Sequence, residues 1–595
     1  MLKRKGLNVA ATAVAILAIA AGLAGWRLRR PGLSDGLPGQ RKIVVPAWPA
    51  SGGMLVPIMA YTREWNSTDE DAWEPVPCIK QRLLIPAGKE LKLVVLHCGR
   101  LLELKAIGFI RWQLFRLSRG RMARPEQKSI LMSLAFLDRL GRNDVQEIAL
   151  YQSLITPAEL RHVTRLTGLR RLEIAFSRGF EPSVFEQLER LPQATRLELG
   201  SLNPPLEFKQ PINAWNGWPP ASASSGTMGL HLAKLSRLRQ LTVANGSAFS
   251  EADLTNLAQS KSLEAFGVPS AWGPREPIKS EWLRILGAMP SLRALDLQGA
   301  PLTDENQDEL RKFVSLRKIR LPLENRSDAA LREIPAWPAI EEADLTLPQI
   351  TTATLARLGE SGSLRTLRIE NTPLDDDRLA ILAGKKSLRR LSIRLGAATD
   401  AGLARIGELK LLERLELDMG SSSTASLAPI GEMSSLRSLT LRTSRPGLAI
   451  LPLAGLVNLE QLRLEIKNLS DDELAHLAGL KALRSLTIAS ERFTGAGLAH
   501  LKGLAVLREL TLRSSRPGGV PFRLNEVATD HLAQLPALET LALSVGDHVP
   551  EIVSLLKRLS RLKRLDLAGS TGIGDKEAAD LRRALPNCDL KLVWY

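Results

Sequence analysis

Residues 388–409 read LRRLSIRLGAATDAGLARIGEL, and this stretch contains the unit from which most of the chain is built. It opens with apolar residues at the spacing L-x-x-L-x-I, namely Leu388, Leu391 and Ile393. Apolar residues that alternate with polar ones predict a short strand with one buried face.

The second half of the same stretch has helical spacing. Thr399 precedes three apolar residues, Leu403, Ile406 and Leu409, which recur every third position. This pattern predicts a short helix that begins near Thr399 and buries one stripe of side chains.

The L-x-x-L-x-L unit returns about every 24 residues from Val145 onward, and each step between Leu292 and Leu436 is 24 residues. The clear copies begin at Leu169, Leu238, Leu292, Leu316, Leu364, Leu388, Leu412, Leu436, Leu459, Leu483, Leu507, Leu538 and Leu562. Weaker copies begin at Val145, Ala194, Leu263 and Ile340, which gives about 17 repeats. Short units at a fixed period predict a solenoid, because each unit buries its apolar face only against its neighbours.

We therefore expect an α/β solenoid in which the repeats of residues 145–586 form an arc. Strands stacked about 4.8 Å apart would form a parallel concave sheet, with short helices outside. A helix within 129–144 would cap the first repeat, and 587–595 would add a last strand. The apolar residues expected in these two caps are Ile130, Leu131, Leu134, Leu137, Leu140, Leu590, Leu592 and Trp594.

Polar residues mark the expected helix starts. Thr156 precedes Pro157 and lies three residues before Glu159, as in a capping box. The other expected starts are Ser183 with Glu186, Ser470 with Glu473, and the pairs Thr303-Asp304, Thr399-Asp400 and Thr529-Asp530. We interpret these residues as structural and not catalytic.

The segment Thr399-Asp400-Ala401-Gly402-Leu403 resembles the "TD-x-GL" step of cysteine-containing leucine-rich repeats. That repeat type occurs in F-box proteins and in uncharacterised bacterial membrane-anchored repeat proteins, and the resemblance covers about 145–595. It implies a leucine-rich-repeat fold that binds other molecules. No F-box is recognisable before the repeats, so the ubiquitin-ligase role of those relatives is not carried over. The ending 585–590 resembles the terminal half-repeat of the bacterial relatives.

The chain departs from that type at the eighth position after the first leucine, where the type has Asn or Cys. The residues found there include Thr372, Gly396, Gly420, Ser444 and Ser570. Thr and Ser can bond loop backbone but Gly cannot, so we do not expect a continuous side-chain ladder.

Residues 7–26 carry no charge and are flanked by Lys3, Arg4, Lys5, Arg27, Arg29 and Arg30. Twenty residues of helix span about 30 Å, the thickness of a bilayer core. We expect residues 1–30 to be a transmembrane signal-anchor, with the repeats on the extracytoplasmic side of the membrane. The alternative is a signal peptide cleaved near Ala20, which would give a secreted protein.

Residues 31–128 read as a Pro- and Trp-containing linker followed by a basic capping region. We expect strands at 79–85 and 91–96 around a turn at 86–89. Residues 89–128 contain ten Lys/Arg and three Asp/Glu. They could bind an anionic cell-envelope polymer or lipid, or they could simply be a solvated basic flank.

The formal net charge is +17, but it is unevenly distributed. Residues 1–130 carry 21 Lys/Arg and 9 Asp/Glu, whereas the remaining residues carry 59 and 54. The nearly balanced repeats argue against nucleic-acid binding.

The residue after the first leucine of each repeat is usually charged. Arginine occupies it at 170, 239, 293, 317, 365, 389, 437, 484 and 508, and glutamate at 264, 341, 413, 460 and 539. Arg and Glu on adjacent strands predict cross-strand ion pairs that stabilise the sheet.

A second set of arginines in the middle repeats is a candidate site for a protein or peptide partner. Its members flank the inward-pointing residues: Arg368, Arg390, Arg394, Arg414, Arg442, Arg463 and Arg513. Arginine grips carboxylates through bidentate hydrogen bonds. We expect that replacing Arg394, Arg414 and Arg442 with Glu abolishes partner capture without unfolding the protein.

Three insertions interrupt the period, at 200–230, 269–280 and 514–527. Trp215, Trp218 and Trp272 lie in the first two, and Trp282 follows the second. Insertions in solenoids often contribute to binding, and Trp is a common hot-spot residue. We therefore include Trp215, Trp218 and Trp272 in the candidate site; the alternative is that these rings pack within their own loops.

The chain lacks the motifs of hydrolases, nucleotide-binding loops and zinc sites, so we expect no catalytic activity, cofactor or bound metal. His476 and His500 are 24 residues apart, but two histidines without further ligands do not make a zinc site. Cys78 and Cys98 could form a disulfide, and we interpret Cys588 as a small apolar residue of the terminal cap. We expect a monomeric interaction scaffold.

Overall fold

The computed structural model describes 41–44, 58–64, 74–75, 82–85, 89–96 and, with gaps, 134–593. The gaps are 152–155, 176–181, 200–225, 244–249, 269–276, 301, 304–305, 323–336, 347–349, 359, 361, 421–422, 445–447, 514–525, 545–548 and 569–574. The chain divides into two compact units, Met1–Phe313 and Val314–Tyr595, which we call unit 1 and unit 2.

The described strands of unit 1 are β1 (Arg41–Val44), β2 (Ile58–Glu64), β3 (Glu74–Pro75), β4 (Arg82–Ile85), β5 (Lys89–Leu96), β6 (Glu147–Tyr151), β7 (Arg171–Ala175), β8 (Arg196–Leu199), β9 (Gln240–Val243), β10 (Ala265–Gly267) and β11 (Ala294–Asp296). Its described helices are η3 (Leu134–Arg139), α3 (Pro157–Thr164), α4 (Pro182–Leu188), α5 (Thr227–Ala233), α6 (Glu251–Leu257), α7 (Ser280–Gly287) and η7 (Gln307–Lys312), where η denotes a 3₁₀ helix.

Strands β6 to β11 of unit 1 run parallel, each paired with the next in sequence. Strand β5 pairs in parallel with the outer edge of β6, and β2 pairs antiparallel with β5. An open strand edge exposes unpaired N–H and C=O groups, so β5 closes the start of the repeat sheet.

The strands expected around the turn at 86–89 are observed, but they do not pair with each other. Strand β4 pairs with β1, whereas β5 pairs with β2 and β6. The physical reason is that the free edge of β6 offers β5 a full ladder of backbone partners, which a short strand such as β4 cannot match.

The helix expected within 129–144 is observed as the 3₁₀ helix η3. Leu134 and Leu137 are buried on it, whereas Ile130 and Leu131 lie outside the described residues. The Glu159 carboxylate of α3 accepts a hydrogen bond from the backbone N–H of Leu134. Arg165 donates to the carbonyl of Leu137 at 3.2 Å. Glu159 therefore ties α3 to η3 instead of completing the expected capping box.

The described strands of unit 2 are β12 (Lys318–Pro322), β13 (Glu342–Thr346), β14 (Thr366–Leu374), β15 (Arg390–Leu395), β16 (Arg414–Asp418), β17 (Ser438–Thr443), β18 (Gln461–Ile466), β19 (Ser485–Ala489), β20 (Glu509–Arg513), β21 (Thr540–Ser544), β22 (Arg564–Ala568) and β23 (Asp589–Val593). Its described helices are α8 (Thr352–Arg357), α9 (Asp376–Ala383), α10 (Asp400–Gly407), α11 (Ala428–Gly431), η9 (Leu451–Gly455), η10 (Asp472–Leu477), η11 (Gly495–Leu501), α12 (Glu526–Ala533), α13 (Val549–Leu556) and α14 (Asp575–Ala584).

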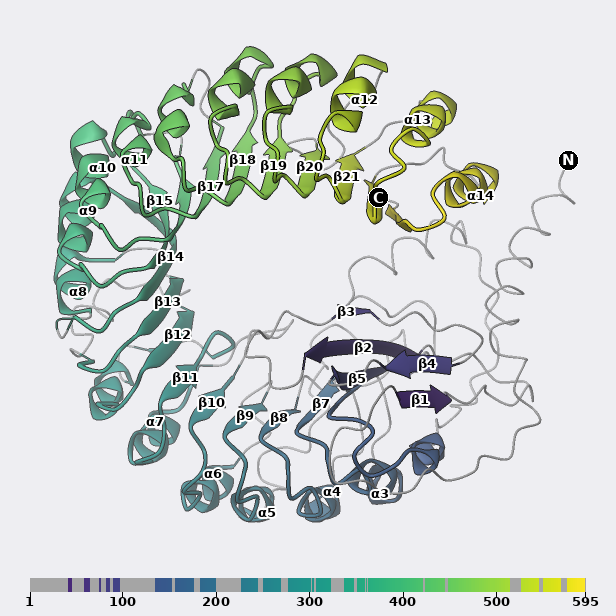
Figure 1. Cartoon of the computed structure of the whole chain (residues 1–595). Coiled ribbons are helices and arrows are strands. Elements are labelled where there is room, and N and C mark those ends of the chain that lie inside the picture. The colour runs from purple at the N-terminus through teal and green to yellow at the C-terminus, as the bar shows by residue number, and fades with distance from the viewer. Residues whose placement is uncertain are drawn as a thin grey trace, which may run out of the picture. The chain divides into compact units, whose positions relative to one another are not determined.

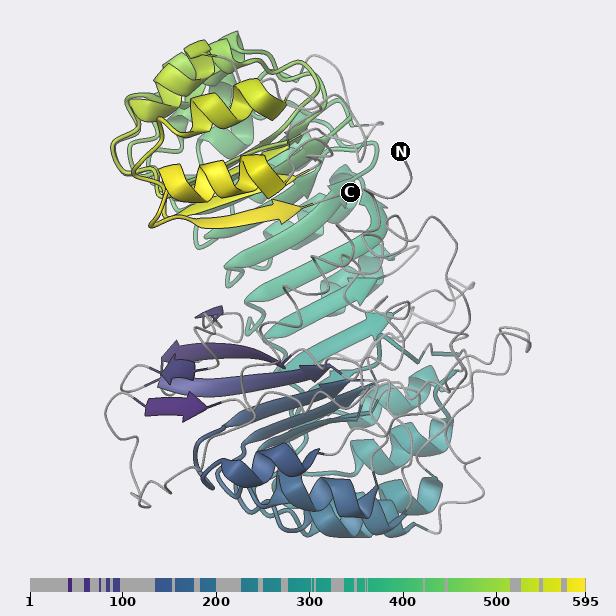
Figure 2. The same cartoon turned by 90° about the vertical axis from the view of Figure 1, so that its right-hand side faces the viewer.

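The twelve described strands of unit 2 form one parallel ladder with the register that the repeat predicts. Leu391 lies opposite Leu415, which lies opposite Leu439. The repeated leucines are almost completely buried between the sheet and the helices. Within unit 2 the strands line the inner side of the curve and the helices the outer side (Figures 1 and 2). This curvature follows because packed helices need about 8–10 Å, whereas strands need about 4.8 Å.

Two of the predicted helix starts are confirmed as side-chain caps. The Thr156 hydroxyl accepts a hydrogen bond from the N–H of Glu159 at 3.2 Å, and Pro157 is the first residue of α3. The Thr399 hydroxyl accepts from the N–H of Ala401 at 3.2 Å, and α10 begins at Asp400.

The other four helix starts differ from the prediction. Helix α4 begins at Pro182, because proline is favoured at a first helical position, so Ser183 lies inside it. Helix α12 begins at Glu526, so Thr529 is carried onto its buried face. The N–H of Thr303 donates to Asn306, which directly precedes η7. At Ser470 only the glutamate half of the capping box forms, with the Ser470 N–H donating to Glu473 at 3.0 Å.

An aspartate at the start of one helix is bonded to the start of the next, and this contact explains the "TD-x-GL" pattern. Asp376 accepts hydrogen bonds from the N–H of Thr399 at 2.8 Å and from its hydroxyl at 2.6 Å. Hydrogen bonding to Thr399 and to the Gly402 backbone outweighs the effect of burial and lowers the pKa of Asp376. Asp471 bonds Thr494 in the same way. These hydrogen bonds therefore fix the position of each helix start relative to the preceding one.

The eighth position contains glycine at 420 because the backbone requires it. Gly420 has φ +58°, and a Cβ there would lie 2.3 Å from the Leu395 carbonyl oxygen. Its N–H donates to the Asp418 carboxylate at 3.0 Å. Asn or Cys would clash at this point, so the side-chain ladder of the cysteine-containing type is interrupted here.

The expected transmembrane segment, 7–26, and Cys78 and Cys98 lie outside the described residues. Among the residues that the structure does describe, no helix combines the length and the apolar character needed to span a bilayer.

We predict that Gly402→Ala destabilises the protein, because a Cβ at 402 would lie 2.0 Å from Oδ1 of Asp376 and 2.9 Å from its Cα. Displacing Asp376 breaks its bonds to Thr399, so the expected loss is about 1–3 kcal/mol. Urea unfolding, monitored by circular dichroism, measures this loss of stability. Gly479→Ala is the matched control, because a Cβ there meets only one atom, at 4.0 Å. Equal midpoints for the two variants would contradict this account.

Candidate binding surface

The seven predicted arginines all lie on the inner face of the sheet between β14 and β20. Alternate residues of a strand point to the same face, so each strand presents up to three side chains between or beside its buried residues. We call these positions the first, second and third rows along each strand. The first row contains Arg390 and Arg414, the second Arg368 and Arg463, and the third Arg394, Arg442 and Arg513.

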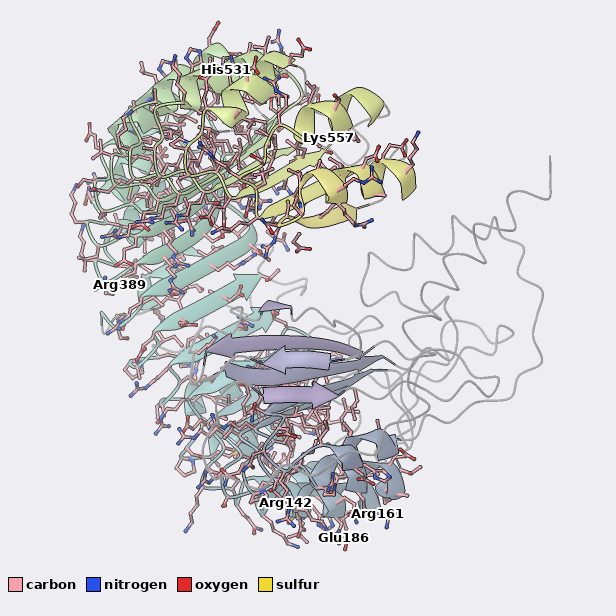
Figure 3. The ribbon with its side chains drawn as sticks, turned by 45° about the vertical axis from the view of Figure 1, so that its right-hand side comes forward. Arg142, Arg161, Glu186, Arg389, His531 and Lys557 are labelled. Atoms are coloured by element: carbon pink, nitrogen blue, oxygen red, sulfur yellow. The ribbon has the colours of Figure 1, made fainter. Side chains whose placement is uncertain are left out.

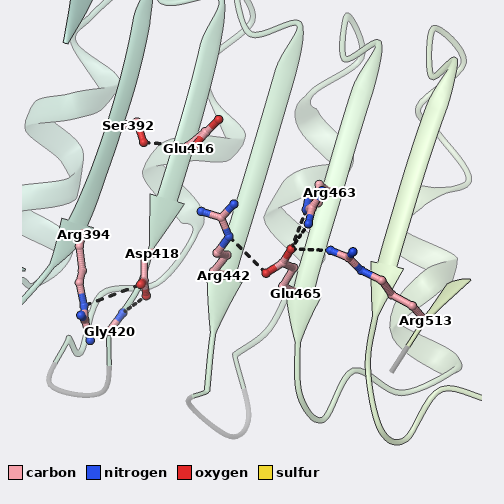
Figure 4. A network of polar contacts seen from close by, with 9 residues as sticks. All are labelled: Ser392, Arg394, Glu416, Asp418, Gly420, Arg442, Arg463, Glu465 and Arg513. Atoms are coloured by element: carbon pink, nitrogen blue, oxygen red, sulfur yellow. Dashed lines mark hydrogen bonds and ion pairs between the residues drawn. The ribbon is translucent and has the colours of Figure 1, made fainter. Parts of the chain in front are cut away.

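Glu465 on β18 is held by three arginines from three strands (Figure 4). It accepts from Arg463 Nε at 2.6 Å, from Arg442 Nε at 3.2 Å and from Arg513 Nη2 at 2.9 Å. Arg513 lies two strands away, and it reaches Glu465 because Ala489 on the intervening β19 is small. This cluster keeps three guanidinium groups fixed on the inner face.

The environment of Glu465 favours its ionised form. Burial alone would raise the pKa of the carboxyl group. The hydrogen bond from Arg463 and the charges of Arg463, Arg442 and Arg513 outweigh burial and hold this pKa below its usual value. The Glu465 side chain is 24% exposed, so solvent screens these interactions only in part. The repeat spacing alone does not identify Glu465 as the centre of this cluster, because Arg513 lies two strands away from it.

Arg394 has an acidic neighbour on only one side, for a reason the sequence does not reveal. Its Nε lies 3.7 Å from Asp418 on β16. On the other side, counting residues would place Glu370 opposite Arg394, but a bulge in β14 places Pro373 there instead. Glu370 bonds Arg368 on its own strand, at 2.8 Å from Nε.

Arg390 and Arg414 are direct register partners on β15 and β16, and both are exposed. Among the described residues, no carboxylate lies within ion-pair distance of either guanidinium. The nearby Glu416 instead accepts a hydrogen bond from the Ser392 hydroxyl at 3.2 Å (Figure 4). Two positive charges thus lie side by side on the inner face, where the other five predicted arginines each have a carboxylate partner.

Six of the arginines that follow the first leucine of a repeat form the cross-strand pairs that the sequence predicts, namely Arg239, Arg317, Arg389, Arg437, Arg484 and Arg508. Arg389, labelled in Figure 3, contacts Glu413 at 2.5 Å. Arg437 contacts Glu460 at 2.6 Å. These exposed pairs stabilise the edge of the sheet only weakly, by about 0.2–1 kcal/mol each.

The tryptophans of the insertions are not placed on this surface. Trp215, Trp218 and Trp272 lie outside the described residues. Trp282 is 4% exposed on α7, so it packs in the core and is not available to a partner. Trp337 is also buried.

The described residues contain no cluster of three or more His, Cys, Asp or Glu side chains that could hold a metal ion. Cys588 is partly exposed, and its pKa is raised to about 11 by burial and by the charges of Asp589 and Asp566. The thiol is therefore protonated at neutral pH and a poor nucleophile.

No family model matches the chain, and no curated protein matches its sequence. Solved structures with a similar fold include the TLR13–ssRNA13 complex, with 18% identity over 76% of this chain and 71% of that chain, at a TM-score of 0.40. A protein with leucine-rich repeats from Leptospira interrogans has 16% identity over 78% of this chain and 100% of that chain, at a TM-score of 0.34. An internalin from Listeria monocytogenes has 13% identity over 73% of this chain and 94% of that chain, at a TM-score of 0.31.

The 24-residue unit, the parallel ladder with one strand per repeat and the outer helices together decide the architecture. The chain has a leucine-rich-repeat fold. The finer resemblance to the cysteine-containing repeat type remains a prediction, because the low identities establish no particular repeat class.

We predict that Glu465→Gln lowers stability by roughly 1–3 kcal/mol at pH 7, because three arginines lose their shared carboxylate. The pKa of Glu465 is lowered in the folded state, so its ionised form stabilises the fold above the usual glutamate pKa. This contribution is lost as the pH falls through the lowered value. The difference between wild type and variant in urea midpoint should therefore shrink below about pH 4.

Glu413→Gln serves as the control, since Glu413 bonds one exposed arginine. A Glu465→Gln effect no larger than that of the control, or one that persists at low pH, would contradict the cluster's role.

Proposed function

We propose that this protein is a non-catalytic interaction scaffold that binds an acidic protein or peptide on the inner sheet face of β14–β20. The observation that carries this proposal is the exposed Arg390–Arg414 pair, which lacks a carboxylate partner among the described residues. Like charges placed side by side cost free energy unless a ligand neutralises them.

The charge of the whole face supports an acidic partner. Across the three rows of β14–β20 there are seven arginines and five carboxylates, which leaves a net charge of +2. The carboxylates are Glu370, Glu416, Asp418, Glu465 and Glu509. Most of them hold an arginine or a hydroxyl in place, so the guanidinium groups are ordered before a partner arrives, which reduces the entropy lost on binding.

The structure changes how this surface is best tested. Replacing Arg394 and Arg442 with Glu would place new carboxylates beside Asp418 and Glu465, so lost binding and lost stability would be hard to separate. Arg390 and Arg414 contribute no internal ion pair among the described residues, so their replacement leaves the internal network intact.

We predict that Arg390→Ser combined with Arg414→Ser weakens partner binding by about 10–100-fold without lowering the melting temperature. The immobilised full chain would capture partners from the source cells, and mass spectrometry and titration would then measure the loss. Arg437→Ser combined with Arg508→Ser removes the same charge from two arginines that already have glutamate partners, Glu460 and Glu539. This control variant should bind like wild type. Equal loss in both variants, or none in either, would contradict the proposal.

The anionic polymer or lipid alternative, which uses 89–128, stays a prediction. Residues 89–96 form β5 inside the sheet, and 97–128 lie outside the described residues. Polymer binding would survive removal of 145–595, whereas binding to the inner sheet face would not.

We also propose that residues 7–26 anchor the protein as a single-pass membrane segment, with the repeats on the extracytoplasmic side. The uncharged run of 20 residues supports the membrane segment, whereas its basic flanks, with three basic residues on each side, do not distinguish the two orientations. The prediction is that the full chain stays in the membrane pellet after alkaline carbonate extraction. Release of an intact repeat domain into the medium would instead favour cleavage near Ala20.

A further inference from the structure

Unit 1 contains an arginine pair at the same repeat positions as Arg390 and Arg414. Arg171 on β7 and Arg196 on β8 are register partners in the first row. One Glu198 oxygen accepts from Arg171 Nη2 at 2.8 Å and from Arg196 Nε at 2.6 Å. The two arginine side chains are only 18% and 21% exposed. Glu198 therefore shows how a single negatively charged oxygen can bridge two arginines at these repeat positions.

Two further carboxylates surround the unit 1 pair. Glu147 on β6 lies 3.7 Å from Arg171, and Glu173 on β7 lies 3.8 Å from it. With Glu198, which lies 2.8 Å away, three carboxylates therefore surround Arg171.

Hydroxyl residues replace two of these carboxylates in unit 2. The position of Glu147 is occupied by Thr366, and that of Glu173 by Ser392. Only Glu416, at the position of Glu198, remains acidic, and it bonds Ser392 and neither arginine. The unit 2 pair therefore has two carboxylates fewer at these positions than its counterpart in unit 1.

We propose that Arg390 and Arg414 bind a phosphoryl group on the acidic partner. This inference rests on the proposed function and specifies the chemistry of the group that the surface recognises. A phosphate monoester carries about −1.5 to −2 charges at pH 7, so a single group can supply the charge of the two carboxylates that hydroxyls replace in unit 2. A carboxylate supplies only one negative charge and so replaces only one of the two.

The available hydrogen-bond donors also match a phosphoryl group. The two guanidinium groups extend from adjacent strands that lie about 4.8 Å apart at the backbone. Each is planar and can donate two parallel hydrogen bonds to phosphate oxygens. A phosphate monoester has three such oxygens, so one can bridge both arginines as Glu198 does in unit 1 and the others remain for further donors. Thr366, the register partner of Arg390, adds a hydroxyl beside them.

The first test uses inorganic phosphate and the full chain. We expect wild type to broaden the phosphate ³¹P resonance and Arg390→Ser with Arg414→Ser to weaken binding at least about tenfold. Thr366→Glu with Ser392→Glu installs the two carboxylates of unit 1 and should abolish the broadening. Thr487→Glu with Thr511→Glu makes the same charge change on β19 and β20 and should leave it nearly unchanged.

Absence of broadening in wild type, or equal broadening in all four proteins, would overturn the phosphoryl site. Either result leaves the proposed function to be judged by its own capture experiment. A uniform loss in both glutamate variants would also overturn the site, because it would show a general charge effect.

The second test compares three peptides of one acidic sequence with phosphoserine, glutamate or serine at a central position. We expect the phosphoserine peptide to bind wild type at least about tenfold more tightly than the glutamate peptide, and this preference to vanish in Arg390→Ser with Arg414→Ser. Equal binding of the phosphoserine and glutamate peptides would overturn the phosphoryl preference while supporting the acidic-partner function.

Discussion

The in-register stacking of buried leucines is the constraint on which the rest of the structure depends. Each repeat can exclude water from Leu388, Leu391 and Ile393 only by placing them against the corresponding residues of its neighbours. A strand shifted by one residue would turn its leucines toward solvent. The register is therefore fixed by burial, and it places every residue between the leucines in a defined row.

Polar contacts between neighbouring repeats complement this apolar core. On the helical side, Asp376 bonds Thr399 and so fixes the start of α10 relative to α9. At the turns before the strands, the Ser387 hydroxyl donates to the Leu364 carbonyl at 2.7 Å, and Ser435 donates to the Leu412 carbonyl at 2.9 Å. These bonds satisfy groups that the apolar core cannot, so each repeat is tied to the next at several separate points.

The fixed rows also decide which charges meet on the inner face. Where an acid falls within reach, as Glu465 does between Arg442 and Arg513, the charges are compensated within the protein. Where the neighbouring positions carry hydroxyls, as around Arg390 and Arg414, the positive charge remains exposed to solvent. The inner face thus presents both an internally paired cluster around Glu465 and an arginine pair without a carboxylate partner among the described residues, and we propose the second as the binding site.

The sequence by itself determined the strands, the buried leucines, the position of Arg389 beside Glu413, and the face on which the seven arginines lie. These follow from local periodicity, because burial forces residues at equal repeat positions to stack. Only the tertiary structure decided that β5 pairs with β6, that a bulge in β14 moves Glu370 away from Arg394, and that Ala489 lets Arg513 reach Glu465. These features depend on a free strand edge, an irregular register and the space left by a small side chain. None of the three changes the leucine pattern, so the sequence alone could not reveal them.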